Sequence, residues 1–333
     1  RDKFILGKNF FNFENNFRKF NNSKFCVGVN SGLDALLLSL KSLNLKKNSE
    51  IIVPSNAYIA AVFAIINAGL KPVFVEPDID TYNINPDLIS KKINSRTKAI
   101  LIVHLYGRPC QMDKIMKISK QNKLYLIEDC AQSHGAKFNK KMTGTFGDFG
   151  CFSFYPTKNL GSIGDAGAII LKNKKNYRTI LKLRNYGSIK KNKHEIVGFN
   201  SRLDELQAAF LNLKLKKLKK INLHKKKLAK IYLEELNDKF IKPKEEKNVE
   251  NVYHIFPIRF RERDKLSQYL KRKNISTLIH YPTPPYLQKF YKKNKNQDYP
   301  ISNEIHKTIL SLPISTIHKE KDIMRIIDIM NRF

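Results

Sequence analysis

Between residues 26 and 129, five short apolar runs alternate with segments of helical character. The runs are 26–29, 51–54, 71–75, 99–103 and 124–127. Each run has the length of a strand rather than of a buried helix, and the helical segments between them allow consecutive strands to run parallel. Two further strand candidates follow at 149–154 and 166–171. The alternation therefore predicts an α/β chain with a mostly parallel sheet that helices cover on both faces.

An acid and a lysine, Asp129 and Lys158, each follow the end of a strand candidate. The run at 124–127 leads into Asp129, which places an acid at a strand's carboxyl end, where open α/β sheets bind ligands. Lys158 comes shortly after the run at 149–154. This pair suits pyridoxal phosphate, whose aldehyde needs an amine for a Schiff base and whose ring nitrogen needs a carboxylate to stay protonated. Taken singly, Asp129 also fits a turn cap, and Lys158 also fits a solvated lysine.

A turn of small residues near the start of the chain offers a site for an anion. The turn at 30–33 opens a helix, so free N–H groups and the positive end of the helix dipole are presented there. Its Ser31 also fits plain N-capping of this helix. Ser153, five residues before Lys158, is a second group that could hold a phosphate.

The residues around Asp129 and Lys158 form a pattern that resembles the DegT/StrS family of sugar-nucleotide aminotransferases. The resemblance runs from about Phe4 to the C-terminus. It implies the aspartate aminotransferase-like fold (fold type I of pyridoxal-phosphate enzymes), with a mostly parallel seven-stranded sheet between helices in a large domain and a smaller α+β C-terminal domain. It also implies pyridoxal 5'-phosphate as the cofactor and no metal.

The resemblance assigns each contact with this cofactor to a residue. Lys158 forms the Schiff base and Asp129 holds the ring nitrogen, while the remaining ring contacts fall to Tyr58, which stacks, Ala131, which packs on the ring face, and Gln132, which bonds the phenolic oxygen. The phosphate contacts fall to Ser31, Gly32, Leu33, Ser153 and, across a homodimer interface, the partner's Asn200. Such a dimer has composite active sites. From the residues alone, Tyr58 also fits core packing, and Asn200 also fits a helix-capping region.

Four further residues are predicted to line the substrate side of this site. Tyr155 lies three residues before Lys158, and His280 and Tyr281 lie in a loop that prolines stiffen. In the family branch that acts on 3-keto sugars, the corresponding loop approaches the hexose. His134 is included as a group that lines the site, although a hydrogen-bonded loop histidine fits equally.

The sequence from Gly32 to Leu36 resembles this 3-keto-sugar branch. The resemblance implies transfer of an amino group from L-glutamate to a dTDP-linked 3-keto-6-deoxyhexose, which gives 2-oxoglutarate and a dTDP-3-amino-3,6-dideoxyhexose for polysaccharide, glycan or antibiotic assembly. A 4-keto sugar and a UDP-linked 3-keto sugar remain alternatives. A dehydratase is disfavoured, because relatives with that activity carry histidine where this chain has Lys158.

Two domains are expected: a large cofactor-binding domain over residues 1–190, and a connecting helix with a small domain over 191–333. The connecting helix is predicted as one element from Glu205 to about Leu236. Relatives carry a further segment ahead of the stretch that matches Phe4–Gly7, so we expect that the chain lacks its N-terminal segment.

The formal net charge of +33 raises the alternative of a basic nucleic-acid-binding protein on the same fold. The lysines are spread along the chain, however, and no zinc-ligand spacing or RNA-binding aromatic motif accompanies them, so we expect no specific nucleic-acid partner. Four cysteines in 333 residues make no disulfide framework, which indicates a reduced, cytoplasmic protein. The apolar runs fall well short of the ~20 residues of a membrane helix, so no membrane insertion is expected.

Overall fold

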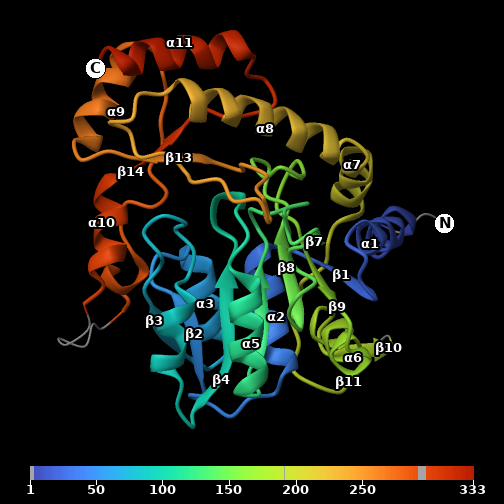
Figure 1. The fold of residues 1–333 in the computed structure, drawn as a ribbon. Coiled ribbons are helices and arrows are strands. Elements are labelled where there is room, and N and C mark those ends of the chain that lie inside the picture. Colours follow the sequence, from blue (N-terminus) through green and yellow to red (C-terminus); the bar gives the residue numbers. More distant parts are fainter. Residues whose placement is uncertain (1–3, 191, 292–297) are drawn as a thin grey trace.

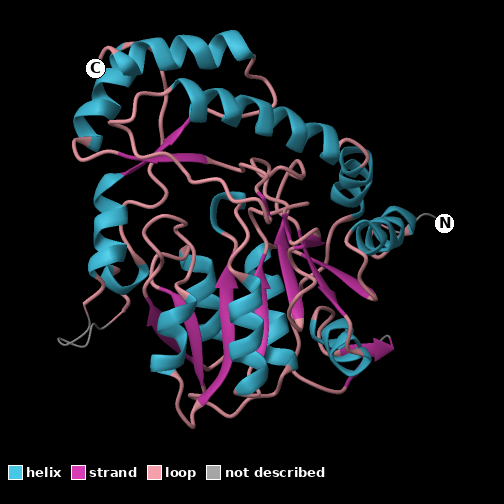
Figure 2. Ribbon diagram, viewed as in Figure 1, coloured by secondary structure: helices cyan, strands magenta, loops and turns pink. Residues whose placement is uncertain are grey.

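The computed structural model describes residues 4–190, 192–291 and 298–333, apart from the side chain of Ile189. Its centre is a seven-stranded sheet in the order β1-β9-β8-β5-β4-β2-β3 (Figures 1 and 2). The strands are β1 (Phe25–Val29), β2 (Glu50–Pro54), β3 (Lys71–Val75), β4 (Thr97–Val103), β5 (Tyr125–Asp129), β8 (Phe149–Ser153) and β9 (Gly167–Leu171). From β8 to β3 all neighbours are parallel, and β9 runs antiparallel to β1 and β8. The predicted mostly parallel sheet is confirmed.

Helices cover both faces of this sheet, and alternate strand residues pack into different layers. In β4, Leu101 and Val103 belong to one hydrophobic cluster, whereas Ile100 and Ile102 belong to another on the opposite face. The helices of the large part are α1 (Lys8–Phe20), α2 (Gly32–Ser42), α3 (Ile59–Asn67), α4 (Pro86–Ile89), α5 (Met112–Gln121), α6 (Lys174–Leu183) and α7 (Glu205–Leu215). The first cluster includes side chains of α2, α3 and α6, and the second includes those of α4 and α5.

Apart from the two clusters that flank the sheet, a separate hydrophobic core lies beyond the sheet's carboxyl edge, and we call it the second core (Figure 1). It is formed by α8 (Leu218–Glu235), α9 (Arg263–Arg272), α11 (Glu320–Asn331) and the antiparallel pair β13 (Phe256–Arg259) and β14 (Ile309–Leu312). Helix α10 (Pro300–Thr308) leads into β14. The remaining short strands are β6 (Lys137–Phe138), β7 (Lys141–Met142), β10 (Ser188–Lys190), β11 (Lys193–His194) and β12 (Val249–Glu250). Since the carboxyl ends of the parallel strands face this second core, ligand-binding groups can come from both sides.

The predicted single helix from Glu205 to Leu236 is wrong, because the structure divides it into α7 and α8. The turn between them is closed by a hydrogen bond from the Lys217 N–H to the Lys214 carbonyl. Leu211 of α7 packs in the cluster that contains the phenylalanines of α1, whereas Leu228 of α8 packs in the second core. The break lets each helix follow its own packing partner, which no glycine or proline in this segment signals.

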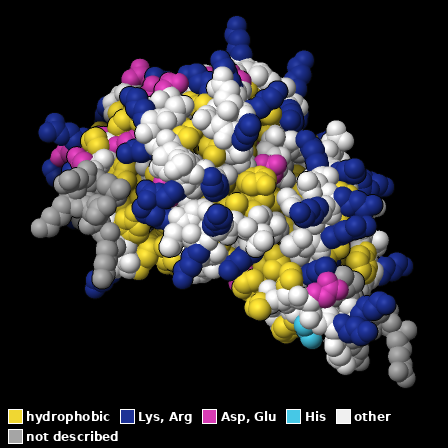
Figure 3. Space-filling view, turned by 90° about the horizontal axis from the view of Figure 1, so that it is seen from below, with side chains coloured by type: hydrophobic (Ala, Val, Ile, Leu, Met, Phe, Trp, Pro, Cys, Tyr) yellow, Lys and Arg dark blue, Asp and Glu magenta, His cyan; other side chains and the backbone are white. Residues whose placement is uncertain are grey.

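The basic surface has no single concentrated stripe on the face that Figure 3 shows. Lysine and arginine side chains are scattered across that face, with hydrophobic and uncharged groups between them. A dispersed charge of this kind attracts anions over long range but forms no defined groove for a nucleic-acid backbone. Among the described residues, no helix combines the length and the apolar character that crossing a membrane requires.

Candidate active site

The sheet brings Asp129 and Ser153 to its carboxyl edge. Asp129 ends β5 and pairs in register with Val103 on one side and Cys151 on the other, and Ser153 ends the neighbouring strand β8. Lys158 lies in the loop after β8, where its N–H donates to the Tyr155 carbonyl over 2.9 Å. The strand order alone therefore gathers three of the predicted residues.

Asp129 is a buried acid in the described part of the chain, where no cationic side chain lies within ion-pair distance of it. Its side chain is 6% exposed, and the Asp129 Oδ1 accepts a hydrogen bond of 3.0 Å from the Ala131 N–H. Burial raises the pKa of this carboxyl, although the Ala131 N–H, Lys158 and His104 each act to lower it. A bound cation such as a protonated ring nitrogen would stabilise the carboxylate here.

Lys158 carries an amine that is easily deprotonated. Burial lowers its pKa to about 8, against the opposing attraction of Asp129. At pH 7 about a tenth of the amine is therefore unprotonated, far more than for an ordinary lysine, and this is the form that attacks an aldehyde. The Lys158 Nζ lies 3.5 Å from the His254 Nε2.

The amide of Gln132 is held in one orientation by two neighbours. Its Oε1 accepts a 2.6 Å hydrogen bond from the Tyr106 N–H, so its Nε2 faces the other way and donates to the Tyr281 hydroxyl over 3.1 Å. One N–H of this Nε2 remains for a further acceptor. The phenolic oxygen of the predicted cofactor is a suitable acceptor for it.

The loop that carries His280 and Tyr281 contacts the tyrosines Tyr58 and Tyr106. The rings of Tyr281 and Tyr58 lie with their centroids 4.9 Å apart, and Tyr58 is 50% exposed. The Tyr106 hydroxyl donates to the His280 carbonyl, and the His280 Nδ1 lies 2.9 Å from the Ser311 Oγ. Burial, followed by the nearby Lys158, lowers the pKa of His280 to about 4, which keeps the imidazole neutral.

The start of α2 forms a close-fitting cradle with the end of β8. Ser31 caps the helix, since its Oγ accepts a 3.1 Å hydrogen bond from the Asp34 N–H. A Cβ placed on Gly32 would lie only 2.6 Å from the Cβ of Ser153, so glycine is required for this approach. The half-buried backbone of Gly32 and Leu33 and the Ser153 hydroxyl thus meet where the resemblance places a phosphate.

The other predicted residues differ in how exposed they are. Tyr155 is 51% exposed, and Asn200 is exposed in a strand-like bridge to Asn185. His134 is only 1% exposed and lies against the rings of Phe152 and Phe154. Burial and the charge of Lys158 lower the pKa of His134 to about 3. Its position beneath the lysine loop gives it packing contacts rather than an open wall of the site.

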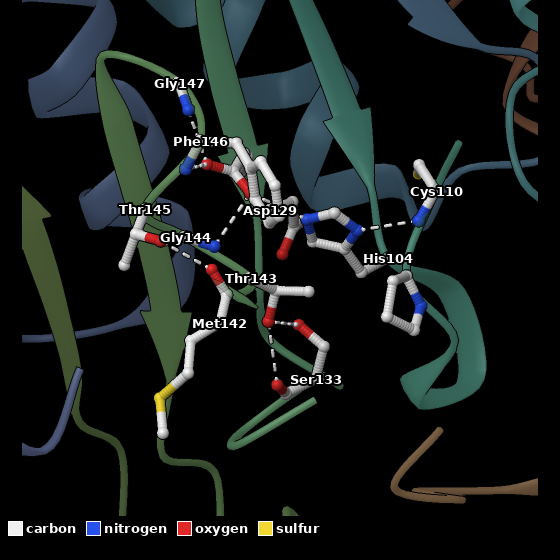
Figure 4. Close-up of polar contacts among 12 residues, drawn as sticks. His104, Cys110, Asp129, Ser133, Met142, Thr143, Gly144, Thr145, Phe146 and Gly147 are labelled. Atoms are coloured by element: carbon white, nitrogen blue, oxygen red, sulfur yellow. Dashed lines mark hydrogen bonds and ion pairs between the residues drawn. The ribbon is translucent and has the colours of Figure 1, made fainter. Parts of the chain in front are cut away.

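A buried carboxylate behind Asp129 escaped the sequence analysis. Glu128 Oε2 accepts from the His104 Nε2 over 3.0 Å and from the Gly144 N–H over 2.7 Å (Figure 4). Its Oε1 accepts from the N–H groups of Phe146 and Gly147 over 2.8 and 2.7 Å. The ligand atoms of His104, Glu128 and Cys130 lie within 4.8 Å of one another, but hydrogen-bond donors already occupy both carboxylate oxygens. These hydrogen bonds stabilise the loop at residues 144–147, which lies beside Asp129.

Lys225 and His254 were also missed. They line a cavity of about 890 Å³ together with Lys158 and His280, and its charged wall adds Lys214, Arg325 and Asp322. Lys225 sits within a lysine-rich segment, which suggested a solvated face. Its spacing of three from Asn222 and four from Ala229 would have placed it on the buried face of α8. The excess of positive charge suits an anionic ligand.

The pyridoxal-phosphate expectation fits these residues, because a titratable amine, a buried acid without an ion pair among the described residues and a glycine cradle face one region.

Comparison with known proteins agrees. A curated relative from Aneurinibacillus thermoaerophilus, "dTDP-3-amino-3,6-dideoxy-alpha-D-galactopyranose transaminase", is 46% identical over 99% of this chain and 91% of its own length. Another, "UDP-N-acetyl-3-dehydro-alpha-D-glucosamine 3-aminotranferase" from Acidithiobacillus ferrooxidans, is 38% identical over 92% of this chain and 83% of its own.

The crystal structure of S. venezuelae DesV in complex with a ketimine intermediate superposes with a TM-score of 0.96 at 38% identity, covering 99% of this chain and 90% of DesV. The likeness therefore extends through both cores and through the region between them. The cofactor of such aminotransferases is pyridoxal phosphate. The profile of the DegT/DnrJ/EryC1/StrS aminotransferases matches residues 1–331. The chain belongs to the DegT/DnrJ/EryC1/StrS aminotransferase family.

Proposed function

We propose that this aminotransferase converts a dTDP-linked 3-keto-6-deoxyhexose and L-glutamate into a dTDP-3-amino-3,6-dideoxyhexose and 2-oxoglutarate. The observation that carries the proposal is the Lys158 amine, which is partly buried, has a pKa lowered to about 8 and opens onto a basic cavity. The name of the 46% identical relative supports a dTDP-linked 3-amino-3,6-dideoxyhexose as the product.

Bound pyridoxal phosphate supplies an aldehyde for the amine and a ring that withdraws electrons from the carbon being deprotonated. Asp129 holds the ring nitrogen in its charged form. Gln132 would donate its remaining Nε2–H to the phenolic oxygen, and Gly32, Leu33 and Ser153 would bind the phosphate. The Lys158 Nζ accepts the proton released from the glutamate carbon, holds it and returns it to a second carbon.

The basic wall of the cavity suits the diphosphate of a nucleotide-linked sugar. Lys214 and Arg325 contribute positive charge, and the neutral His280 in the same wall offers a hydrogen bond to a hexose. Tyr281, the next residue in the chain, lines a neighbouring pocket with Tyr58 and offers its hydroxyl there. The UDP-linked alternative draws its support from the 38% identical relative named for such a substrate. The scattered surface charge gives no comparable support to the nucleic-acid alternative.

We further propose that the enzyme is a homodimer in which Asn200 completes the partner's phosphate site. Asn200 is exposed, and its neighbour Ser201 donates to the Asp34 carboxylate at the start of α2 over 2.7 Å. This contact fixes the loop near the phosphate cradle. The four free cysteines are buried, which supports a reducing, cytoplasmic location.

Incubation with L-glutamate and each of three acceptors tests the substrate: a dTDP-linked 3-keto sugar, a dTDP-linked 4-keto sugar and a UDP-linked 3-keto sugar. We expect kcat/KM for 2-oxoglutarate release to be highest with the first. The Lys158→Arg variant keeps the charge but cannot form a Schiff base, so it is the inactive control. A higher kcat/KM for either other sugar would overturn the assignment, and turnover by the Lys158→Arg variant would overturn the chemistry.

A further inference from the structure

His254 touches the reacting nitrogen of the predicted active site. Its side chain is 8% exposed, and its Nε2 lies 3.5 Å from the Lys158 Nζ. Its other ring nitrogen is buried and has no hydrogen-bond partner among the described residues. Among the described residues, Lys158 is therefore the only hydrogen-bond partner of the His254 ring.

The imidazole of His254 is held neutral by its surroundings. Burial lowers its pKa well below the usual range, and the positive charges of Lys158 and Lys225 lower it further. A neutral imidazole has one unprotonated nitrogen that accepts a hydrogen bond. In the tautomer that carries its proton on Nδ1, the acceptor is Nε2, which faces the Lys158 amine, while Asp129 attracts the same amine electrostatically.

Helix α8 fixes the imidazole relative to the lysine loop. The Lys225 Nζ donates to the Asn159 Oδ1 over 3.0 Å and to the His254 carbonyl over 2.9 Å. The Asn159 Nδ2 in turn donates to the Asn222 Oδ1 and to the Val252 carbonyl, each over 3.0 Å. The buried Lys225 side chain therefore ties the residue after Lys158 to His254 itself, so the approach of the two nitrogens is built into the fold.

We propose that His254 is a catalytic residue that accepts a hydrogen bond from the Lys158 ammonium and so stabilises the lysine in the state that holds the transferred proton. The proposal rests on the function proposed above. The proton is not passed to His254: between its arrival and its return it stays on the Lys158 Nζ, and His254 changes only how strongly that nitrogen retains it. Without this acceptor the Lys158 ammonium would lose a hydrogen-bond partner, and the amine would be a weaker base.

The pH dependence of Lys158 acetylation by acetic anhydride, measured on the full chain without cofactor, tests this directly. Peptide mass spectrometry reads Lys158, and the exposed Lys193 serves as an internal reference. In His254→Leu we expect the Lys158 midpoint to fall by about one pH unit or more, because a hydrogen bond to a charged group is lost. His254→Gln retains an acceptor at the position of Nε2, so its midpoint stays within about half a unit.

Two further variants separate this role from a structural one. His254→Asn is polar but too short to reach the Nε2 position, and we expect its midpoint to fall as in the leucine variant. His194→Leu removes an exposed histidine of β11 and is the matched control, with an unchanged midpoint. An unchanged midpoint in both His254→Leu and His254→Asn, or a rise in either, overturns the proposal.

Turnover gives a second readout. With glutamate deuterated at C2, the isotope effect on kcat should increase in His254→Leu and return toward that of the wild type in His254→Gln, because proton transfer becomes slower in the former. An equal isotope effect in both variants contradicts the role. If the wild type transfers no amino group from glutamate, the proposed function fails, whereas the acetylation midpoints judge His254 independently.

Discussion

The buried carboxylate of Glu128 allows a sharp test of how the loop beside Asp129 is stabilised. Glu128 is 0% exposed and accepts four hydrogen bonds, two at each oxygen (Figure 4). The His104 Nδ1 accepts from the Cys110 N–H over 3.1 Å, so the proton of this imidazole lies on Nε2 and points at Glu128. All four neighbours of the carboxylate are therefore donors.

The substitution Glu128→Gln keeps the size of the side chain but replaces one acceptor oxygen by an NH₂ group. Whichever way the amide is turned, its NH₂ faces two N–H donors: His104 and Gly144 in one orientation, or Phe146 and Gly147 in the other. Each buried donor left without an acceptor costs about 1–3 kcal/mol, so the free energy of unfolding should fall by roughly 2–6 kcal/mol.

Urea unfolding of the wild type and the variant, followed by circular dichroism, measures this difference. The control is Glu250→Gln, in which a partly exposed carboxylate loses its ion pair with Lys137 and the free energy should change by at most about 1 kcal/mol. A Glu128→Gln loss no larger than that of the control would refute the argument, because the four donors would then have other partners.

Two further predictions concern the reaction. Asp129→Asn should leave the cofactor bound, as judged by its absorbance after gel filtration, but lower kcat by about a hundredfold or more, since the amide cannot keep the ring nitrogen protonated; near-normal kcat would show that another acid serves the ring. Lys158→Ala and Asn200→Asp, each inactive alone, should regain activity when mixed under subunit exchange, because one site of the mixed dimer keeps both residues intact; verified heterodimers without activity would place Asn200 in its own subunit's site.

Much of the fold follows from patterns that the sequence displays openly. Short apolar runs between helical segments predict a parallel sheet, and an acid at the end of one run predicts where Asp129 lies. The position of β9 between β1 and β8 was not predicted, because the pairing of strands far apart in sequence depends on side-chain packing across the whole sheet.

The site was predicted where chemistry and local position coincide, as for Asp129 and Lys158. Lys225 and His254 escaped because their roles arise from tertiary contacts: a lysine in a basic helix resembles a solvated one until its partner Asn159 is known. His134 shows the opposite case, a residue that was predicted in the site but packs elsewhere. It lies only two residues after Gln132 in the sequence, yet its ring packs against Phe152 and Phe154.

The contact between Gly32 and Ser153 has a consequence for how this site can vary in evolution. A Cβ at position 32 would lie 2.6 Å from the Cβ of Ser153 and 3.2 Å from its Cα, so residue 32 cannot gain a side chain while residue 153 keeps its own. Even a glycine at 153, which would remove the hydroxyl that the phosphate would use, leaves a tight contact with the backbone. Positions 32 and 153 therefore cannot vary independently in evolution: a larger residue at 32 requires the loss of the Ser153 side chain and of its phosphate contact.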